Sequence, residues 1–487
     1  MSDGPSDGRM TGGSRVAEGR LAQLGLIDPT AAEELLARVA QSGVETVRIV
    51  FPDQHGLLRG KTVVASALGS ALRGGLGVPS TVLLKDTSNR TVFDVWSEET
   101  PVPSMRGAGD VLMVPDPATF RVVPWSPHSA WILADVVHGD GTPVAFASRT
   151  VLARAVEALA AQGMTAKMGL EVEVMIFRRT DAGPAHSDIG MPGAPPATEA
   201  FAHGYRFLGE GRYDEAEPIL DELRRAAQAM GMPVRSVEVE FGPNQYEMVF
   251  DPAPPMAQAD TMVLFRAMVK DLCARRGLHA TFMTRPRFDN LIASGWHVHQ
   301  SVERDGRNLF IPGESGTPGA EASGWIAGLL EHAAASCPMI APTVNSYKRY
   351  QPFQLAPNRI AWAKDNRGAM LRALMMPGDG ASRIENRAPD GMANPHYAFA
   401  SQIHAGLDGV TRGLSAPDAT LSPYADDAPA LPTSLGAALD ALDGSAFYRQ
   451  AMGDEVVDYL CTIKRAEWSR YLASVSEWEQ AEYFGIF

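Results

Sequence analysis

The sequence predicts a protein of the α+β fold class. Short strand-like segments and helical segments are mixed along the chain, and no internal repeat is present. The chain has 487 residues, which is enough for two domains and a large core. Hydrophobic residues make up 45% of the chain and charged residues 21%, the proportions of an ordinary soluble globular protein. These observations lead us to expect domains of mixed helix and sheet.

The first helix and the first strands are predicted near the N-terminus. In DPTAAEELLARVAQSG, Asp28 is a suitable cap, Pro29 lies in the first turn and Gly43 follows the last helical residue. VRIVF (47–51) predicts a strand, and FPDQHGLLRGKTVV predicts a turn that leads into another strand. The first domain is therefore expected to be small and rich in strands.

A change of composition near residues 142–150 marks a domain boundary. GTPVAFASR is followed there by TVLARAVEALAAQG, an amphipathic helix that ends at Gly163. We predict a disordered tail over 1–20, an N-terminal domain over 21–145 and a C-terminal domain over 146–487. The tail is rich in glycine and serine and lacks the apolar stretch of a signal peptide.

The second domain is predicted to alternate between strands and helices. MGLEVEVMIF (168–177) has the composition of a strand, and residues 180–200 that of a loop. EAEPILDELRRAAQAMG (215–231) predicts a helix, and further strands surround EVEFGPNQYEMVF and GWHVHQS. The chain is expected to end in a long helical tail over 455–484.

Charge, cysteine content and hydropathy exclude several classes of function. The net charge is −14 and no basic stripe is visible, which argues against an extended nucleic-acid surface. Cys273, Cys337 and Cys461 are far apart and suggest neither a disulfide framework nor a zinc site. No apolar run approaches the roughly 18–20 residues of a membrane span. We expect a cytoplasmic protein without a nucleic-acid or membrane partner.

GWHVHQS carries two histidines that share one face of a strand. Side chains alternate along a strand, so His297 and His299 point to the same side while Val298 points away. Such a pair is either a satisfied structural pair or a pair of ligands. Acidic partners elsewhere in the chain would favour ligands.

Two further segments supply carboxylates. Glu171 and Glu173 share one face of MGLEVEVMIF, and Glu240 and Glu247 flank GPNQY. Neighbouring carboxylates on a strand this apolar are costly unless a cation meets them. An edge strand with its polar face in water would be an alternative explanation for the first pair alone.

The segment SRIENRAPD adds arginines to the same chemistry. Arg383, Glu385 and Arg387 alternate along it, so cation and anion share one surface, as a site for metal-bound anions requires. Several carboxylates with one imidazole suit magnesium or manganese, whereas zinc prefers more nitrogen or sulfur ligands. The sequence therefore predicts a carboxylate-rich site for divalent cations.

Taken together, these motifs resemble the glutamine synthetase family. MGLEVEV, EFGPNQYE, GWHVHQS, NSYKRY, NRGAMLR and SRIENRAPD occur in its order and spacing, and the resemblance runs from FPDQHGLLRGKT to VSEWEQAEY. It implies the glutamine synthetase fold, in which a small β-grasp-like domain precedes a large catalytic domain with a curved antiparallel sheet. It also implies a homo-oligomer of stacked rings, a dodecamer, with active sites between neighbouring subunits.

The resemblance assigns roles to individual residues. It implies two or three magnesium or manganese ions per site, one held by Glu173, Glu240 and Glu247 and another by Glu171, His297 and Glu385. The positions implied to lie near ATP, the co-substrate, are His299, Ser301, Arg372 and Arg383. The implied catalytic residues are Arg367, which faces the transferred phosphate, with Glu385 and Arg387. The implied substrate-binding residues are Arg349 and Arg387, which bind the glutamate carboxylates, and His297.

The implied reaction is phosphorylation of the glutamate γ-carboxylate by ATP, followed by attack of an amine on the acyl phosphate. The residue types suit this chemistry, because cations and guanidinium groups stabilise the charge that spreads over a transferring phosphoryl group. Arginine can also hold a carboxylate through two parallel hydrogen bonds, which lysine cannot.

The departures from the family concern the amine. Leu355 stands where ammonia-using members carry a glutamate that attracts ammonium and takes up its proton. Phe353 and Trp296 are further candidates for an amine pocket, and Asp86 is the candidate for its acid. We interpret the chain as a ligase for an amine other than ammonia, with an apolar or aromatic amine favoured.

Three other segments depart from known motifs. Ile292 and Ala293 replace an Asn-Gly pair that holds the amino-acid end of glutamate in the family, and Tyr424 does not match the family's tyrosine-containing adenylylation loop. GLLRGKT has one residue too few between its glycines for a phosphate-binding P-loop. Two alternatives stay open: glutamine synthetase proper, which uses ammonia, and a catalytically inactive structural relative.

Overall fold

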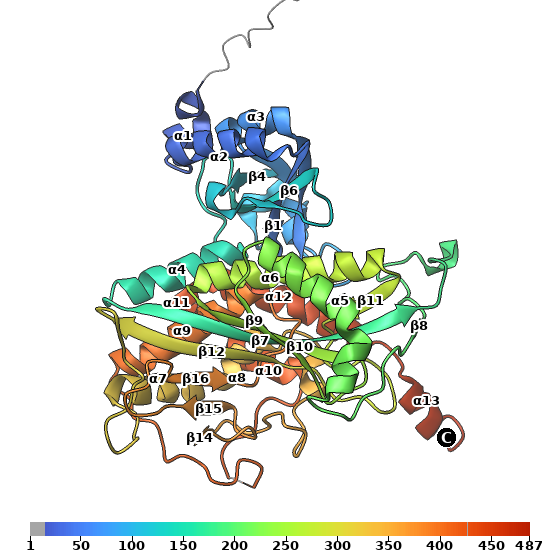
Figure 1. The fold of residues 1–487 in the computed structure, drawn as a ribbon, viewed down its shortest axis with the longest axis vertical. Coiled ribbons are helices and arrows are strands. Elements are labelled where there is room, and N and C mark those ends of the chain that lie inside the picture. The colour runs from blue at the N-terminus through green and yellow to red at the C-terminus, as the bar shows by residue number, and fades with distance from the viewer. Residues whose placement is uncertain (1–14, 426) are drawn as a thin grey trace, which may run out of the picture. The chain divides into compact units, whose positions relative to one another are not determined.

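The structure is a computed structural model that describes residues 15–425 and 427–487. The chain divides into two compact units (Figure 1). The small unit comprises Met1–Phe51, Arg59–Pro79 and Gly109–Val144, and the large unit comprises Pro52–Leu58, Ser80–Ala108 and Ala145–Phe487. Two segments before residue 145 thus cluster with the large unit. The predicted tail falls mostly outside the described residues, but Val16 is buried in a short 3-10 helix, so ordered structure begins before residue 21.

The small unit is a helix-covered sheet with mixed strand directions. Its strands run in the order β2-β1-β6-β4-β3, with β5 paired to β6. The β1–β6 pair is parallel, whereas the β3–β4, β4–β6 and β5–β6 pairs are antiparallel. Its elements are η1 (Val16–Glu18), α1 (Arg20–Gln23), α2 (Pro29–Ser42), β1 (Thr46–Pro52), β2 (Leu58–Val64), η2 (Ala65–Ala67), α3 (Leu68–Gly74), β3 (Leu76–Pro79), β4 (Asp110–Pro115), η5 (Pro117–Thr119), β5 (Arg121–Val122) and β6 (Ser129–Val137).

The ends of α2 confirm the sequence prediction. The Asp28 carboxylate accepts a hydrogen bond from the Thr30 amide, which caps the helix, and Pro29 occupies the first turn. Gly43 follows the helix in the left-handed region at φ 72°, a conformation that costs glycine little.

The large unit is built around one long, mostly antiparallel sheet. The strand order is β14-β15-β16-β12-β7-β10-β9, with β8 and β11 paired to β7 and β13 paired to β12. The strands are β7 (Thr165–Arg179), β8 (Thr198–Glu199), β9 (Val234–Val239), β10 (Gln245–Ala253), β11 (Leu278–Thr281), β12 (Trp296–Arg304), β13 (Arg307–Asn308), β14 (Trp362–Lys364), β15 (Leu371–Leu374) and β16 (Arg383–Asn386). The β14–β15 pair is parallel, whereas the family resemblance led us to expect antiparallel pairing.

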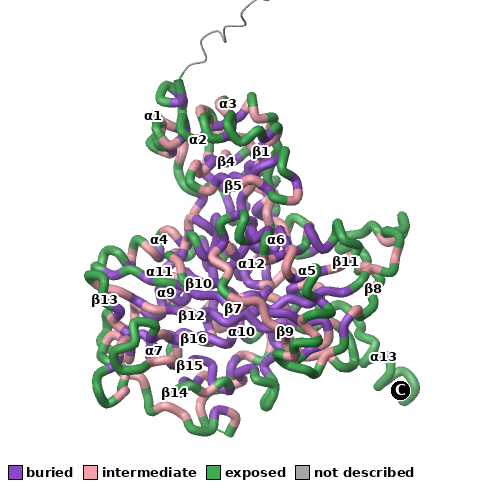
Figure 2. Tube along the Cα trace, in the orientation of Figure 1, coloured by how far each residue is buried: buried purple, intermediate pink, exposed green. Residues whose placement is uncertain are grey.

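Helices cover one face of this sheet. The helices are α4 (Ser148–Ala160), α5 (Glu210–Ala229), α6 (Pro255–Arg275), α7 (Ala320–Glu331), α8 (Ala333–Ile340), α9 (Pro395–Thr411), α10 (Leu435–Asp443), α11 (Ala446–Met452), α12 (Asp454–Leu472) and α13 (Glu477–Tyr483), with 3-10 turns η3 (Ser80–Leu83), η4 (Pro103–Ala108), η6 (His186–Asp188) and η7 (Ser346–Lys348). Ring contacts join Phe250 of β10 to Phe265 of α6, and Trp296 of β12 to Phe399 of α9. The central strands are therefore largely buried (Figure 2).

The helical tail that we predicted over 455–484 consists of two helices, α12 and α13. The break follows α12, and Ser476 begins α13 by accepting a hydrogen bond from the Glu479 amide while the Glu479 carboxylate bonds the Ser476 amide. This reciprocal capping box favours the start of a new helix, although the composition of the whole segment is typical of a helix. None of the helices within the described residues combines the length and apolar character that a membrane crossing requires.

Strand alternation divides the functional side chains from the core. On β7, Leu170 and Val172 are buried on one side, whereas Glu171 and Glu173 line a cavity on the other. The mixture of helices with this sheet confirms the predicted α+β class.

Candidate active site

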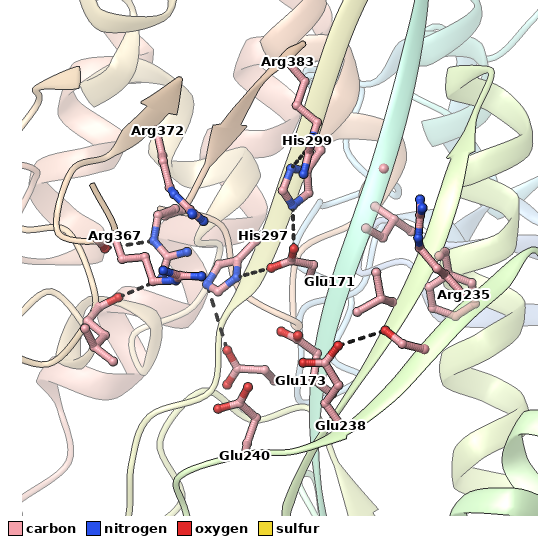
Figure 3. A pocket seen from close by; sticks show the side chains of 18 of the residues that line it. Glu171, Glu173, Arg235, Glu238, Glu240, His297, His299, Arg367, Arg372 and Arg383 are labelled. Atoms are coloured by element: carbon pink, nitrogen blue, oxygen red, sulfur yellow. Dashed lines mark hydrogen bonds and ion pairs between the residues drawn. The ribbon is translucent and has the colours of Figure 1, made fainter. Parts of the chain in front are cut away.

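A large cavity lies on the face of the sheet that carries the charged side chains. Its volume is about 1150 Å³, at the upper end of what small-molecule sites require. Its floor consists mainly of residues of β7, β9, β10, β12, β15 and β16, and further lining comes from loops, among them those near Phe207, Ile292, Leu355 and Arg367. Figure 3 shows the side chains of several strands converging on this space.

The register of the strands brings the predicted ligands into adjacent rows. Glu171 lies opposite His297 in the β7–β12 pair, and Glu173 lies opposite Glu247 in the β7–β10 pair. Glu385 lies opposite His299 in the β12–β16 pair. Directly opposed side chains have β-carbons about 5 Å apart, so residues far apart in sequence become neighbours here. A slip of one residue would turn a whole row toward the core.

His297 stands between two groups of carboxylates. Its Nδ1 lies 3.0 Å from Glu171 Oε2 and 3.6 Å from Glu385 Oε1, and its Nε2 lies 4.0 Å from Glu173 Oε1. The ligand atoms of Glu171, His297 and Glu385 all lie within 4.8 Å of one another, as do those of Glu173, Glu247 and His297. Each group therefore has the separation of side chains that share one cation.

The hydrogen bonds around Glu171 fix the proton on each imidazole. The Arg383 guanidinium donates to His299 Nδ1 at 3.1 Å, so the His299 proton is on Nε2, which lies 2.9 Å from Glu171 Oε1. His297 Nδ1 donates to the other oxygen of Glu171. Although burial opposes the effect, these two imidazoles hold the pKa of Glu171 well below its usual range. His297 Nε2 is left as an electron-pair donor on the side of Glu173.

The group on the other side of His297 is short of positive charge. Burial, and after it the carboxylate of Glu173, raises the pKa of Glu240 to about 8 and raises that of Glu247 well above its usual value. Glu173 and Glu240 lie on the same side of His297 (Figure 3). Buried carboxylates that repel one another are stabilised by a hard divalent cation, and the oxygen-rich donor set fits magnesium or manganese.

Gln245 and Glu238 also belong to this floor, and sequence reasoning missed both. Gln245 Nε2 donates to Glu173 Oε2 at 2.6 Å and to Ser294 Oγ at 3.2 Å, which orients the carboxylate. Glu238 lines the cavity on β9. Their signal was available, because Gln245 alternates with Glu247 and Glu238 alternates with Glu240 in the sequence.

Arginines surround Glu385, which is completely buried on β16. Arg372 donates to Glu385 Oε2 at 3.0 Å, and Arg387 forms an ion pair with Glu385 Oε1. Burial opposes ionisation of Glu385, but the charges of His297 and Arg387 hold its pKa below its usual value. Arg387 also donates from Nε to the Arg367 carbonyl at 2.9 Å. The guanidinium groups thus stand beside the ligand groups.

Most other predicted residues line the cavity. Arg349, Arg367, Arg372, Arg383, Arg387, His299, Ser301, Phe353 and Leu355 all belong to its lining. The Arg349 guanidinium is buried and donates to the carbonyls of Arg387 and Ala388 at 2.9 and 3.2 Å. Arg367 and Arg383 face the same space as His297 (Figure 3).

Two predicted amine-pocket residues lie elsewhere. Trp296 is fully buried and its ring packs 5.6 Å from that of Phe399, because alternation along β12 sends it to the face opposite His297. Asp86 is not in the cavity lining, and its carboxylate accepts hydrogen bonds from Ser88 and from Arg470 Nε. It orders a turn and binds a helix, and its role as the acid of an amine pocket stays a prediction.

A fold of this kind, with carboxylates, imidazoles and arginines on one antiparallel face, defines an enzyme that handles cations and phosphates. The chain belongs to the glutamine synthetase family. The family's catalytic domain matches residues 145–483, and its N-terminal domain matches residues 32–144.

Individual relatives are similar over nearly the whole chain. A γ-glutamylanilide synthase of Acinetobacter is 36% identical over 479 residues, which cover 94% of this chain and 96% of the relative. A γ-glutamylethanolamide synthetase of Streptomyces coelicolor is 34% identical over 465 residues, with the same two coverages. A glutamine synthetase of Methanosarcina mazei is 30% identical over 470 residues, 94% of this chain and 98% of that protein.

Solved structures show the same fold. A structure titled as a complex of GmaS with ADP superposes with a TM-score of 0.78 at 28% identity, and covers 93% of this chain and 99% of the other. A ligand-free GmaS structure gives the same TM-score and identity, with coverages of 92% and 99%. These matches confirm the predicted glutamine synthetase fold.

Proposed function

We propose that this protein is an ATP-dependent ligase that joins the γ-carboxylate of glutamate to an amine other than ammonia. The observation that carries the proposal is Leu355, which lines the cavity at the position where the resemblance expects the ammonium-binding glutamate. The rest of the cavity keeps the carboxylates, imidazoles and arginines that phosphoryl transfer needs. The names of the Acinetobacter and Streptomyces relatives, which denote γ-glutamylamide-forming enzymes, support it.

Enzymes of the family use ATP and divalent cations. In our proposal one ion is held by Glu173, Glu240 and Glu247 and another by Glu171, His297 and Glu385, and the family resemblance allows a third. When bound, magnesium or manganese offsets the negative charge of the phosphates. His297 Nε2 lies 4.0 Å from Glu173 Oε1, so His297 stands between the two proposed ligand groups.

Different arginines are proposed to bind the two substrates, ATP and glutamate. Arg367, Arg372 and Arg383, together with His299 and Ser301, would bind and orient ATP. Arg349 and Arg387 would bind the glutamate carboxylates, because a guanidinium matches a carboxylate with two hydrogen bonds.

The reaction then has two steps, with glutamyl phosphate between them. An oxygen of the γ-carboxylate attacks the γ-phosphorus of ATP, and the bond to ADP breaks. The amine nitrogen then attacks the acyl carbon, the bond to phosphate breaks, and the nitrogen loses a proton. The buried arginines would stabilise the negative charge that develops in both steps, and they would do so without having to change position.

The part of the cavity that is proposed to bind the amine favours an amine whose nitrogen is uncharged. Leu355 offers no charge to a cation, and Ile292 and Phe353 also line the cavity. An ammonium ion would lose hydration there without gaining a partner, whereas hydrocarbon is stabilised by about 25 cal/mol for each Å² that it buries. An arylamine is neutral near physiological pH because its ring delocalises the nitrogen lone pair. We therefore favour an apolar or aromatic amine.

An amine panel tests this function. We expect glutamate-dependent release of ADP from ATP to be faster with aniline or isopropylamine than with ammonia, and the γ-glutamylamide to form in equal amount. A wild-type protein that prefers ammonia over every amine would be glutamine synthetase proper. One that releases no ADP with any amine would be an inactive relative.

We extend the proposal to assembly and location on the basis of the resemblance. The protein would form a homo-oligomer of stacked rings, a dodecamer, whose active sites lie between neighbouring subunits. It would act in the cytoplasm, which agrees with the three buried, unpaired cysteines Cys273, Cys337 and Cys461. Light scattering of the purified protein measures the assembly.

A further inference from the structure

We propose that Tyr424 is a specificity-determining residue, which together with Phe353 forms an aromatic wall for the ring of the amine substrate. The inference rests on the proposed ligase function and deepens it, because it narrows the amine to one that carries an aromatic ring. Sequence reasoning gave Tyr424 no role, and it lies about 70 residues after Phe353 in the chain.

The first observation is the backbone of the loop that carries Phe353 and Leu355. Both residues have positive φ, 61° and 53°, a region that side chains with a β-carbon occupy only at a cost. Both nevertheless line the cavity. A conformation of this kind persists only where its surroundings hold it.

One restraint on this loop comes from Arg387. Its Nη2 donates to the Leu355 carbonyl at 3.2 Å, its Nε donates to the Arg367 carbonyl, and its Nη1 pairs with Glu385. The loop that carries Leu355 is thereby tied to a proposed ligand of the cations and to the arginine proposed to face the phosphate.

The second restraint is Tyr424. Its ring lies 5.0 Å from that of Phe353, centroid to centroid, with the planes tilted by 48°. Its hydroxyl oxygen is buried and adjoins the backbone of Leu355. The loop before α10 that carries Tyr424 therefore packs against the loop before β14.

The Tyr424 ring also lies directly on the chain next to Arg367. A β-carbon at Gly368 would stand 3.0 Å from Cε2 of Tyr424 and 2.8 Å from Cγ of Pro423. Only glycine fits that contact without displacing the aromatic ring. Tyr424 is thus fixed from two sides, by Phe353 and by the backbone beside a cavity-lining arginine.

The Phe353 ring is accessible to a ligand, because it lines the cavity and is 82% exposed. Aromatic rings bind one another at centroid separations of about 4.5–7 Å, in offset or tilted arrangements. A ring-bearing amine could therefore place its ring on Phe353, with Tyr424 holding Phe353 from behind. Its nitrogen would then lie near Leu355 and Arg367, where the acyl phosphate forms in the proposed reaction.

The test compares two amines in four variants. Phe353→Ala and Tyr424→Ala remove the wall, Tyr424→Phe keeps the ring without the hydroxyl, and Leu421→Ala is a matched control on the same loop, because Leu421 is 92% exposed. KM and kcat are measured for aniline and for isopropylamine with ATP and glutamate saturating. The KM values for ATP and glutamate are measured in parallel.

We expect both alanine variants to raise KM for aniline by about 10-fold, the factor that one aromatic pair supports. KM for isopropylamine, glutamate and ATP should change by less than about 2-fold on the same reasoning, because none of them uses the wall. Tyr424→Phe and Leu421→Ala should behave as wild type with aniline.

Three results would overturn the inference. An equal loss with both amines would give Tyr424 and Phe353 a structural role only, and an unchanged KM for aniline would give them none. A wild type that ligates putrescine better than aniline would overturn it as well, while leaving the ligase function intact. A wild type that releases no ADP with any amine would overturn the proposed function itself, so the two failures are distinguishable.

Discussion

Single residues of the site have their roles set by the atoms that face them. Glu171 accepts hydrogen bonds from both imidazoles, so His297 keeps Nε2 available toward Glu173. The imidazole of His297 is thereby held in a fixed orientation between the two proposed ligand groups.

Removing one of the proposed ligands should abolish ligation. We expect Glu173→Ala, Glu247→Ala and His297→Ala each to reduce the rate by at least about 10²–10³-fold, because phosphate charge is left uncompensated. The measurements are ADP release and manganese binding by titration calorimetry.

A matched control exists away from the cavity. Glu331, His332 and Asp408 also form a group with ligand spacing, but Arg412 pairs with Glu331 and Asp408, and His332 bonds Asp408 at 2.8 Å. Glu331→Ala should therefore leave ligation and manganese binding unchanged. Near-normal activity in any of the three site variants would show that the ligands are assigned wrongly.

The two proposed glutamate-binding arginines can be separated from the nucleotide arginines by a conservative change. Arg349→Lys and Arg387→Lys replace a planar group that can form two parallel hydrogen bonds by a point charge. We expect KM for glutamate to rise by about 10-fold or more, and KM for ATP to rise less. Initial-rate kinetics with each substrate varied in turn measure both. A defect confined to ATP would place these arginines at the nucleotide.

At the scale of the element, strand alternation explains both the success and the errors of the sequence prediction. The alternation of side chains along a strand, with a period of two residues, correctly predicted that Glu171, Glu173, His297 and His299 lie on one face. The same rule excludes Trp296, which we had nevertheless taken as a pocket residue because it precedes the first histidine. Proximity in sequence was the wrong measure there, since adjacent residues of a strand face opposite sides.

Other elements required tertiary information. The parallel pairing of β14 with β15 depends on which strands meet, and single segments do not encode it. Asp86 lies in a turn, and only the fold brings Arg470 to its carboxylate. The rings of Tyr424 and Phe353 are in contact, but both residues lie on loops whose sequences carry no periodic pattern.

The core position of Trp296 gives a prediction about β12 and α9. Trp296→Ala removes a fully buried ring that contacts Phe399 and should cost about 3–5 kcal/mol of unfolding free energy. The preference among amines should not change in the protein that remains folded, because the side chain does not reach the cavity. Denaturant unfolding and the amine panel measure the two effects. A changed preference at unchanged stability would return Trp296 to the amine pocket.

At the scale of the whole molecule, the buried carboxylates couple stability to pH and to cations. Burial and Glu173 raise the pKa of Glu240 to about 8, from 4.5 for an ordinary glutamate. Between these values the folded protein holds a proton that the unfolded chain has released. The contribution to stability is therefore fully present below pH 4.5 and is lost as the pH rises through about 8. Glu247 acts in the same direction.

The melting temperature of the metal-free protein should accordingly fall as the pH rises from about 6 to about 9. A divalent cation competes with the retained protons, so the stabilisation by manganese should grow over the same range. Thermal melts in a chelator and in manganese measure both trends, and Glu240→Gln should flatten them. A stabilisation by manganese that does not depend on pH would show that no proton is displaced.

The preference for an amine is a property of the whole enzyme, and Leu355 allows it to be tested with one substitution. Leu355 is 51% exposed in the cavity, so its side chain is available to a substrate and can be replaced without disturbing the core. An apolar wall gains about 25 cal/mol for each Å² of hydrocarbon that it buries, and it offers an ammonium ion nothing in exchange for lost hydration. Leu355→Glu should therefore shift preference toward ammonia and weaken the use of aniline, because the new carboxylate must be desolvated when a ring binds.

The readout of this prediction is the ratio of kcat/KM for aniline to that for ammonia, with Leu355→Gln as the uncharged control. We expect the ratio to fall by about 10-fold or more in Leu355→Glu, since one desolvated carboxylate is worth at least about 1.4 kcal/mol. The ratio for the Leu355→Gln protein should lie between those of the wild type and Leu355→Glu, because its amide is polar but carries no charge to attract ammonium. A ratio that is the same in all three proteins would mean that residue 355 does not contact the amine, and the proposed amine site would then have to be sought elsewhere along the cavity wall.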